Sequence, residues 1–192
     1  VNLLKAENYN QWYLGINPRG LLPALVHNGD VHIESNDIVS YLDETFDIPK
    51  LIPNDHRGRI LEQLNTEDEL HLDLRTLTFG FCLPKFLTRK PPAALNALES
   101  NEGTVEGKID SHKKVQLAFW RELAEHGVTA DQAINSAKRF NDAFSSVEHQ
   151  LANQTFLYGN EISIVDIVWF IYAHRLRSTG YPFKRLHPGL EP

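Results

Sequence analysis

Apolar side chains recur at helical spacing over residues 130–152. They step by four, three, four, three and four positions, through Ala133, Ala137, Phe140, Phe144, Val147 and Leu151. This spacing places them on one face of an α-helix. Thr129 and Gln132 form a capping box at its start. The pattern therefore predicts a long amphipathic helix that belongs to a helical bundle.

Three more helices are predicted from residue 58 onward. Residues 58–82 carry an approximate apolar stripe made of Ile60, Leu64, Leu70, Leu74, Leu77 and Phe81. Residues 111–126 are predicted to form a helix capped by Ser111. Ser163 and Asp166 form a second capping box, which opens a helix that runs to about Leu176. Most of the chain is therefore predicted to be helical.

Two stretches interrupt this helical pattern. Residues 83–110 contain Pro84, Pro91, Pro92, Gly103 and Gly107, and we predict a long, weakly structured connection there. Loops of this length in compact domains are often lids, binding loops or disordered segments. Residues 48–57 contain two prolines among polar residues and are predicted to link two domains.

The first 46 residues follow an α/β pattern. Val1 to Leu4 is a short apolar segment that could end a strand, and Tyr9 to Ile16 could form one or two helical turns. Strands are predicted at 24–27 and 31–33, because Asn28-Gly29 between them is a strong hairpin signal. Ser35 is predicted to cap a helix with an inner face of Ile38, Tyr41, Leu42 and Phe46.

Composition narrows the class of protein. The 192 residues include 19 Lys and Arg against 25 Asp and Glu, a net charge of −6, which argues against a nucleic-acid partner. A single cysteine excludes a disulfide framework and a cysteine-rich zinc site, and it suits a reducing compartment. The longest apolar run, 164–173, is interrupted by Asp166, so we expect no membrane segment. The chain contains no methionine, and we expect it to be part of something longer.

Residues 17–46, NPRGLLPALVHNGDVHIESNDIVSYLDETF, resemble the glutathione-binding domain of glutathione S-transferases. In that family an NPxGxxPxL segment leads into a β-hairpin, a Glu-Ser or Gln-Ser pair, and a helix with a Tyr-Leu pair. The resemblance implies a thioredoxin-like domain at 1–47, with its first strand and helix missing, a linker at 48–57, and an all-helical domain at 58–192. It also implies glutathione as co-substrate.

The resemblance implies specific glutathione-binding residues. Pro23 follows a cis peptide bond in the family, and the turn exposes the backbone of Leu22 to the cysteinyl backbone of glutathione. Glu34 supplies a counter-charge for the γ-glutamyl ammonium, and Ser35 lies at a helix start that favours the γ-glutamyl carboxylate. Taken without the resemblance, Ser35 could be only a helix cap and Glu34 only a surface acid.

The implied activity is thiolate chemistry. The glutathione thiolate attacks a hydrophobic electrophile, by conjugation or by displacement of an ether or halide. The resemblance places the thiol-activating residue (Ser, Tyr or Cys) just after the missing first strand or at the start of the missing first helix, so the catalytic residue is unknown. His71, Arg75 and Phe79 are expected to line an electrophile pocket between the domains, and Arg75 could equally form an interdomain salt bridge.

Several alternatives stay open at this stage. Asn10-Gln11-Trp12-Tyr13 and the long 83–110 connection resemble bacterial transferases related to lignin β-aryl etherases. The long connection also resembles the ganglioside-induced differentiation-associated branch. A non-catalytic ligand carrier or adaptor of the same fold is the main alternative to an enzyme, and glutathione-dependent reduction would need a Cys in the missing helix.

The remaining expectations concern metals, assembly and location. No metal site is expected, because the nine histidines form no HxxxH or HExxH pair. Cys82 is expected to be a buried small hydrophobe rather than a nucleophile. From the family resemblance we expect a cytoplasmic homodimer that acts in detoxification.

Overall fold

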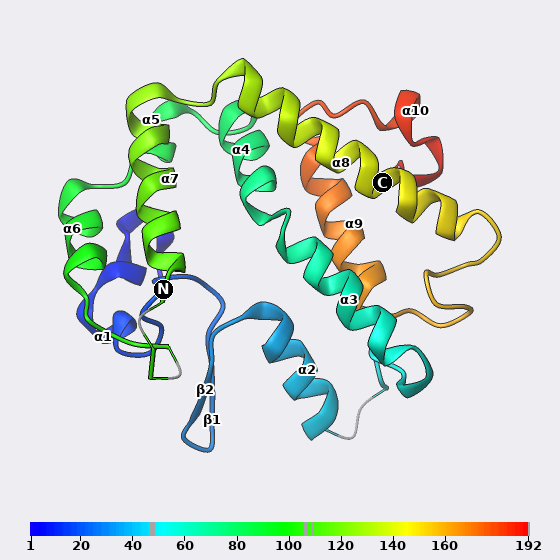
Figure 1. The fold of residues 1–192 in the computed structure, drawn as a ribbon, viewed down its shortest axis with the longest axis horizontal. Helices are drawn as coiled ribbons and strands as arrows, with labels where there is room; N and C mark the ends of the chain where they lie inside the picture. The colour runs from blue at the N-terminus through cyan, green and yellow to red at the C-terminus, as the bar shows by residue number, and fades with distance from the viewer. Residues whose placement is uncertain (47–48, 106, 109, 192) are drawn as a thin grey trace. The chain divides into compact units, whose positions relative to one another are not determined.

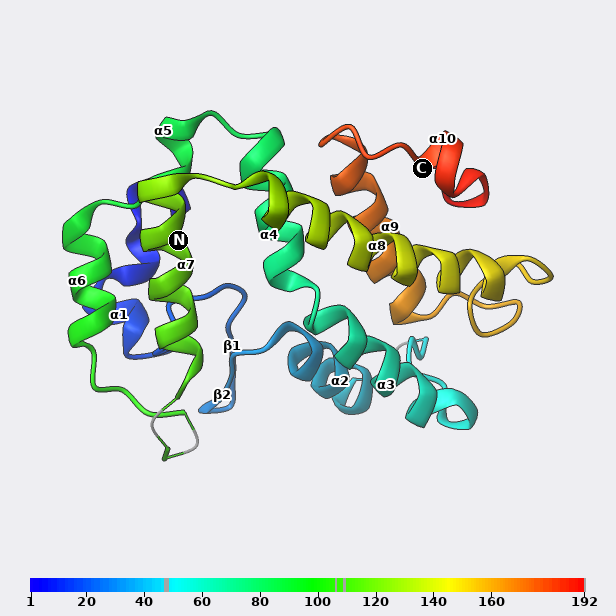
Figure 2. The same ribbon diagram turned by 45° about the horizontal axis from the view of Figure 1, so that its top comes forward.

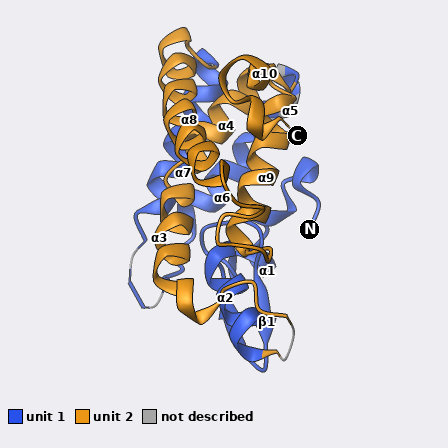
Figure 3. Ribbon diagram, turned by 90° about the vertical axis from the view of Figure 1, so that its right-hand side faces the viewer, with its two compact units in different colours: residues 1–45, 84–127 blue, residues 46–83, 128–192 orange. Residues whose placement is uncertain are grey.

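The computed structural model describes residues 1–46, 49–105, 107–108 and 110–191. The chain forms two compact units, each built from two separate stretches of sequence (Figure 3). Unit 1 comprises Val1–Thr45 and Pro84–Gly127, and unit 2 comprises Phe46–Leu83 and Val128–Pro192. The domain limits expected from the sequence stay a prediction, and their boundary at residues 47 and 48 lies outside the described residues.

Unit 1 begins with short helical turns and a β-hairpin. Its elements up to residue 45 are η1 (Leu3–Lys5), η2 (Glu7–Tyr9), α1 (Gln11–Leu14), β1 (Leu25–His27), β2 (Asp30–His32) and α2 (Ser35–Thr45). The strands pair antiparallel, with Val26 opposite Val31. Asn28 and Gly29 have φ values of 52° and 94°, which a two-residue hairpin turn requires. The predicted hairpin is confirmed, whereas the expected strand end at Val1 to Leu4 is wrong, because a 3-10 turn occupies Leu3–Lys5.

The proline-rich connection contains helices that sequence analysis did not predict. The second stretch of unit 1 holds α5 (Lys85–Thr88), α6 (Pro92–Ser100) and α7 (His112–His126). Helix α6 buries Leu95 and Leu98, and it packs against η2 and α7. The prolines misled the prediction because Pro92 stands at the first position of α6, where a missing N–H costs nothing. The expectation of a weakly structured 83–110 segment is therefore wrong over α6.

Unit 2 is a helical bundle. It contains η3 (Asn54–His56), α3 (Arg57–Asp68), α4 (His71–Phe81), α8 (Ala130–Leu151), α9 (Ile164–Arg177), α10 (Phe183–Leu186) and η4 (Pro188–Leu190). Helix α4 lies beside α8 and α9, and α3 lies beside α9 (Figures 1 and 2). The single stripe predicted over 58–82 is split into α3 and α4, which are separated at residues 69 and 70. Both predicted capping boxes, at Thr129 and Ser163, are present.

The core of unit 2 is aromatic and surrounds Phe144. This side chain is fully buried, and its ring lies 5.1 to 5.9 Å from the rings of Phe140, Trp169, Tyr181, Phe183 and His187. Aromatic pairs in such edge and offset arrangements stabilise a core beyond their area of burial. In the part of the chain that the structure describes, no helix is both long enough and apolar enough to span a membrane.

Candidate functional site

Three side chains hold the loop that leads into the hairpin. Asn17 is fully buried, and its amide nitrogen donates to the Leu21 carbonyl at 2.8 Å. The Tyr13 hydroxyl donates to the same carbonyl at 2.5 Å. The Asn8 amide donates to the Gly20 carbonyl at 2.7 Å. The loop is therefore fixed by hydrogen bonds to its own backbone rather than by packing of its side chains.

Gly20 is required by this arrangement. Its φ of +63° lies in the left-handed region, and a Cβ added here would lie 2.7 Å from the buried Tyr9 ring. Both the backbone conformation and the available space therefore select glycine at the end of the NPRG segment.

The peptide at Leu22 is open to a ligand. The Leu22–Pro23 bond is cis, which confirms that expectation. The Leu22 residue is 42% exposed, and its backbone N–H and C=O have no hydrogen-bond partner among the described residues. Such an unpaired backbone edge can accept an extended peptide as an added strand.

Glu34 and Ser35 lie at the start of α2. The Ile38 N–H donates to the Glu34 carbonyl at 2.9 Å, so the first intrahelical bond belongs to Glu34. Ser35 is the first helical residue rather than the cap, one position from the predicted place. Both residues are half-buried. The first N–H groups of an α-helix lack intrahelical partners and favour an anion.

Arg19 joins this site to a distant part of unit 1, and sequence analysis missed it. Its Nη1 pairs with Glu34 Oε1, while Nε and Nη2 donate to Asp110 at 2.5 and 3.2 Å. Burial alone would lower the pKa of Arg19, but the hydrogen bonds to Asp110 and Glu34 raise it. Burial likewise opposes ionisation of Asp110, but the contacts with Arg19 and His112 together outweigh this and lower its pKa.

No sequence signal could have found this link. Asp110 is 91 positions from Arg19, at the end of the 83–110 segment for which the sequence predicts a weakly structured connection. Arg19 occupies a variable position of the NPxGxxPxL pattern, so the resemblance assigns it no role.

The three residues expected at an electrophile pocket lie on α4, in unit 2. His71 starts the helix, and Arg75 and Phe79 follow at intervals of four, all half-buried. His71 Nε2 lies 3.1 Å from Glu67 Oε1. Burial would lower the pKa of His71, but the hydrogen bond with Glu67 raises it. Their assignment to an electrophile pocket stays a prediction.

One group of residues in unit 2 has the spacing of metal ligands. Glu67, Asp68 and His71 each offer one ligand atom, and these atoms lie within 4.8 Å of one another. The ion pair between His71 and Glu67 explains the same closeness without a metal. The expected absence of a metal site stays a prediction.

Helix α9 carries a cation that sequence analysis did not single out. Arg175 is half-buried, and its Nε donates to the Thr78 hydroxyl on α4 at 3.0 Å. Burial lowers the pKa of this guanidinium. Cys82 follows α4 and is half-buried, which is less than we expected. The hydrogen bond from Arg175 to Thr78 joins α9 to α4, the helix that holds the predicted pocket residues.

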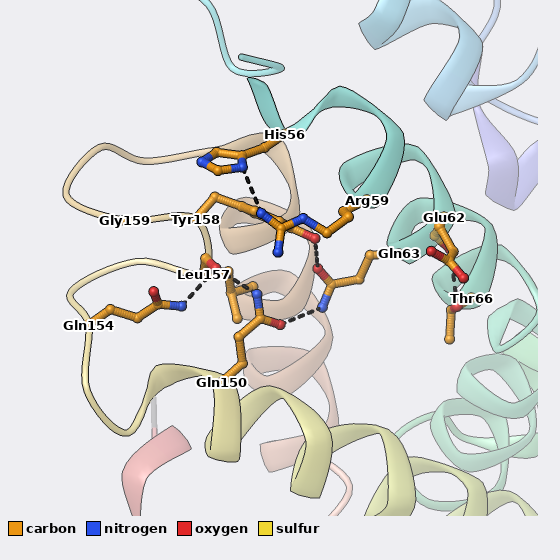
Figure 4. A pocket seen from close by; sticks show the side chains of 10 residues that line it. All are labelled: His56, Arg59, Glu62, Gln63, Thr66, Gln150, Gln154, Leu157, Tyr158 and Gly159. Carbon is orange, nitrogen blue, oxygen red and sulfur yellow. Dashed lines mark hydrogen bonds between the residues drawn. The ribbon is translucent and has the colours of Figure 1, made fainter. Parts of the chain in front are cut away.

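A separate cavity of about 600 Å³ lies in unit 2 between α3 and the loop after α8 (Figure 4). Tyr158 donates to Gln63 at 3.0 Å, and the amides of Gln150 and Gln154 donate to the Leu157 carbonyl. These hydrogen bonds link α3, α8 and the loop after α8. None of the predicted site residues lines this cavity.

Two models of one known protein family match this chain. A model of the "Glutathione S-transferase, N-terminal domain" matches residues 1–50, and one of the "Glutathione S-transferase, C-terminal domain" matches residues 111–191. The chain belongs to the glutathione S-transferase superfamily. The first match contains the loop, the hairpin and the start of α2, and it supports glutathione as the co-substrate.

The chain is also similar to individual members of the superfamily. Protein LigF of Sphingobium sp. strain SYK-6 is 28% identical over 99% of this chain and 74% of its own length. The crystal structure of the β-etherase LigF superposes with a TM-score of 0.77 at 25% identity, over all of this chain and 77% of that one. Glutathione S-transferase L3 of Arabidopsis thaliana is 45% identical over 57 residues, which are 29% of this chain and 24% of that protein.

These comparisons confirm the predicted fold class. The chain has a thioredoxin-like glutathione-binding domain followed by a helical domain, and it lies near the LigF branch of the superfamily. The described part of the first domain contains the two-stranded sheet and α2.

Proposed function

We propose that this chain binds glutathione through Leu22, Pro23, Glu34 and Ser35. The ion pair between Arg19 and Glu34 carries the proposal, because it joins the loop of Leu22 to the start of α2. An open peptide edge, a carboxylate and a helix N-terminus then belong to one connected region of unit 1.

Each of these groups matches one part of the tripeptide. The Leu22 N–H and C=O pair with the cysteinyl backbone, as an added strand would. The first N–H groups of α2, with Ser35, bind the γ-glutamyl carboxylate. Glu34 pairs with the γ-glutamyl ammonium. The similarity of residues 1–50 to the N-terminal domain of glutathione S-transferases supports this assignment.

The proposed reaction is nucleophilic displacement by the glutathione thiolate. A carbon–sulfur bond forms at the electrophilic carbon of a hydrophobic substrate, and the bond to the leaving group breaks. The electron pair of that bond departs with the leaving group, a halide or a phenoxide, and the phenoxide then takes a proton from water. Similarity to a β-etherase over the whole chain favours the ether. The residue that activates the thiol is not assigned.

We further propose that His71, Arg75 and Phe79 contact the electrophile. Phe79 supplies apolar surface, and Arg75 pairs with an anionic or phenolic oxygen. A structural ion pair is the alternative role for Arg75. Turnover of an aryl ether by an Arg75→Gln variant separates the two roles: a loss of kcat/KM at unchanged melting temperature supports substrate contact.

Location and assembly belong to the same proposal. We place the protein in the cytoplasm, where a single free cysteine stays reduced, with a role in detoxification. We propose a homodimer, in line with the superfamily. Sedimentation at micromolar concentration should then give twice the chain mass of 21.9 kDa, and a stable monomer would contradict the dimer.

Calorimetric titration with glutathione tests the central claim. Glu34→Gln should weaken binding by about 1.5–3 kcal/mol, the usual range for a hydrogen bond to a charged group. Glu125→Gln is the matched control, because it removes the same charge from a carboxylate of unit 1 whose side chain is 74% exposed. Equal affinities of the two variants would sink the assignment of Glu34. Binding without turnover of ethers or halides would favour the non-catalytic alternative.

A further inference from the structure

The Arg19 guanidinium is divided between two carboxylates in unit 1. Two of its nitrogens, Nε and Nη2, engage both oxygens of Asp110, and Nη1 engages Glu34. The side chains of Arg19 and Asp110 are only 12% and 11% exposed. Removing this pair from solvent is favourable only when its geometry is good and its hydrogen bonds are satisfied. The arrangement is therefore a rigid link rather than a loose surface contact.

The link uses only one of the two Glu34 carboxylate oxygens. Arg19 contacts Oε1, while Oε2 has no partner in the part of the chain that the structure describes. The Glu34 side chain is 36% exposed, so Oε2 is accessible to a ligand. An ammonium group can pair with Oε2 while Arg19 keeps its hold on Oε1.

Asp110 is itself held in place at the start of α7. Its Oδ1 accepts hydrogen bonds from the backbone N–H of His112 at 3.2 Å and from the His112 ring at 3.1 Å. Asp110 thereby fixes two of the three donor positions of Arg19 and leaves the third for Glu34. The planar fork of an arginine can serve two carboxylates in this way, whereas a lysine ammonium cannot.

We propose that Arg19 is a positioning residue for the glutathione site, oriented by Asp110 so that Glu34 presents Oε2 to the γ-glutamyl ammonium. This inference rests on the proposed function and deepens it. It assigns a part in recognition of the amino end of glutathione to the segment before α7, which lies far from the resemblance at 17–46. Without Asp110, the Arg19 fork would be free to engage both oxygens of Glu34 and cover the ammonium site.

The test compares glutathione with its deaminated analogue, glutaryl-cysteinyl-glycine, in calorimetric titrations of the whole protein. The variants are Arg19→Lys, which keeps the charge but loses the fork, and Asp110→Asn, which keeps the shape but loses the charge. Arg121→Lys is the matched control, because Arg121 forms a single ion pair with Glu99 on the exposed surface of the same unit. Melting temperatures report on folding in parallel.

Both site variants should lose about tenfold in affinity for glutathione, in keeping with a disturbed hydrogen bond to a charged group. Their affinity for the deaminated analogue should stay within about twofold of the unmodified protein, since that ligand lacks the ammonium. Equal weakening of both ligands would show that Arg19 only supports the fold, and unchanged affinities would overturn its role altogether. If the unmodified protein binds neither ligand, the proposed function itself fails.

Discussion

The loop of unit 1 that we propose to bind glutathione and the aromatic core of unit 2 are built in opposite ways. The bonds that Asn8, Tyr13 and Asn17 donate to the loop carbonyls join residues 4 to 12 positions apart, from Asn17–Leu21 to Asn8–Gly20. The side-chain ties between α4, α8 and α9 join residues 63 to 97 positions apart, from Asp73–Ser136 to Thr78–Arg175. The loop takes its shape from nearby polar groups, whereas the bundle depends on distant helices meeting.

Because of this difference, substitutions in the two regions should change different properties of the protein. Hydrogen bonds from Asn8, Tyr13 and Asn17 fix the path of the backbone, and each contributes modestly to stability. The rings around Phe144 contribute much more, because deleting a buried ring leaves a cavity. Changes in the core of unit 2 should therefore lower stability most, and changes in the loop should act mainly on glutathione affinity.

The largest expected effect is a loss of stability on substitution in the core of unit 2. Phe144→Ala should lower the free energy of unfolding by about 3–5 kcal/mol, because it removes a ring with no exposure to water. Urea unfolding followed by circular dichroism measures the loss. Phe170→Ala on α9 is the matched control, since that ring is 60% exposed, and its effect should stay below about 1 kcal/mol. Similar losses for the two variants would contradict the placement of the core.

The next largest expected effect is a loss of glutathione affinity on substitution of Gly20. Gly20→Ala places a Cβ against the Tyr9 ring and adds left-handed strain, so it should shift the loop and weaken glutathione binding. Gly29→Ala separates these causes, because its φ is +94° but its added Cβ meets nothing within 4 Å. Both variants should lose about 1–2 kcal/mol of stability from strain. Calorimetry should show a further loss of glutathione affinity for Gly20→Ala alone, and an equal loss for both would argue against the loop as the site.

The smallest effect is a pH dependence in unit 2. Glu67 raises the pKa of His71 above its ordinary value of about 6.5, so protonated His71 stabilises the fold. This contribution is fully present below pH 6.5, roughly, and is lost as the pH rises through the folded pKa. The side chain is 43% exposed, so the effect should stay below about 1 kcal/mol.

Unfolding of the unmodified protein and of His71→Gln between about pH 5.5 and 8.5 isolates this contribution, because every other side chain is the same in both proteins. The stability difference between the two should shrink as the pH rises. A difference that stays constant across this range would show that His71 carries no linked proton.

The features that could be predicted from the sequence are those that depend on residues adjacent along the chain. Asn28-Gly29 specifies a hairpin turn through φ values that few other residues tolerate, and Thr129 with Gln132 specifies a helix start through reciprocal hydrogen bonds. The cis bond before Pro23 followed from the family resemblance, and the structure has it. For the hairpin turn and the helix start, a few consecutive residues contain the whole physical cause.

The features missed depend on contacts between distant segments. Helix α6 is stabilised by packing against η2 and α7, which outweighs the proline signal in its sequence. The break between α3 and α4 falls within an apparently continuous apolar stripe. Asp110 became part of the candidate site only when the fold brought it to Arg19. The pattern of apolar and polar residues along the chain does not indicate which distant segments contact each other.

The interleaved order of the two units has a consequence for synthesis of the protein. The ribosome makes Val1–Thr45 before Pro84–Gly127, and the first helices of unit 2 are made between these two stretches. Until the second stretch has been made, η2, which contains the buried Tyr9, lacks the α6 helix against which it packs. Domains usually fold as they emerge, N-terminal first. Here unit 1 can be completed only after Pro84–Gly127 has been made, so its first stretch is synthesised well before the helix that packs on it.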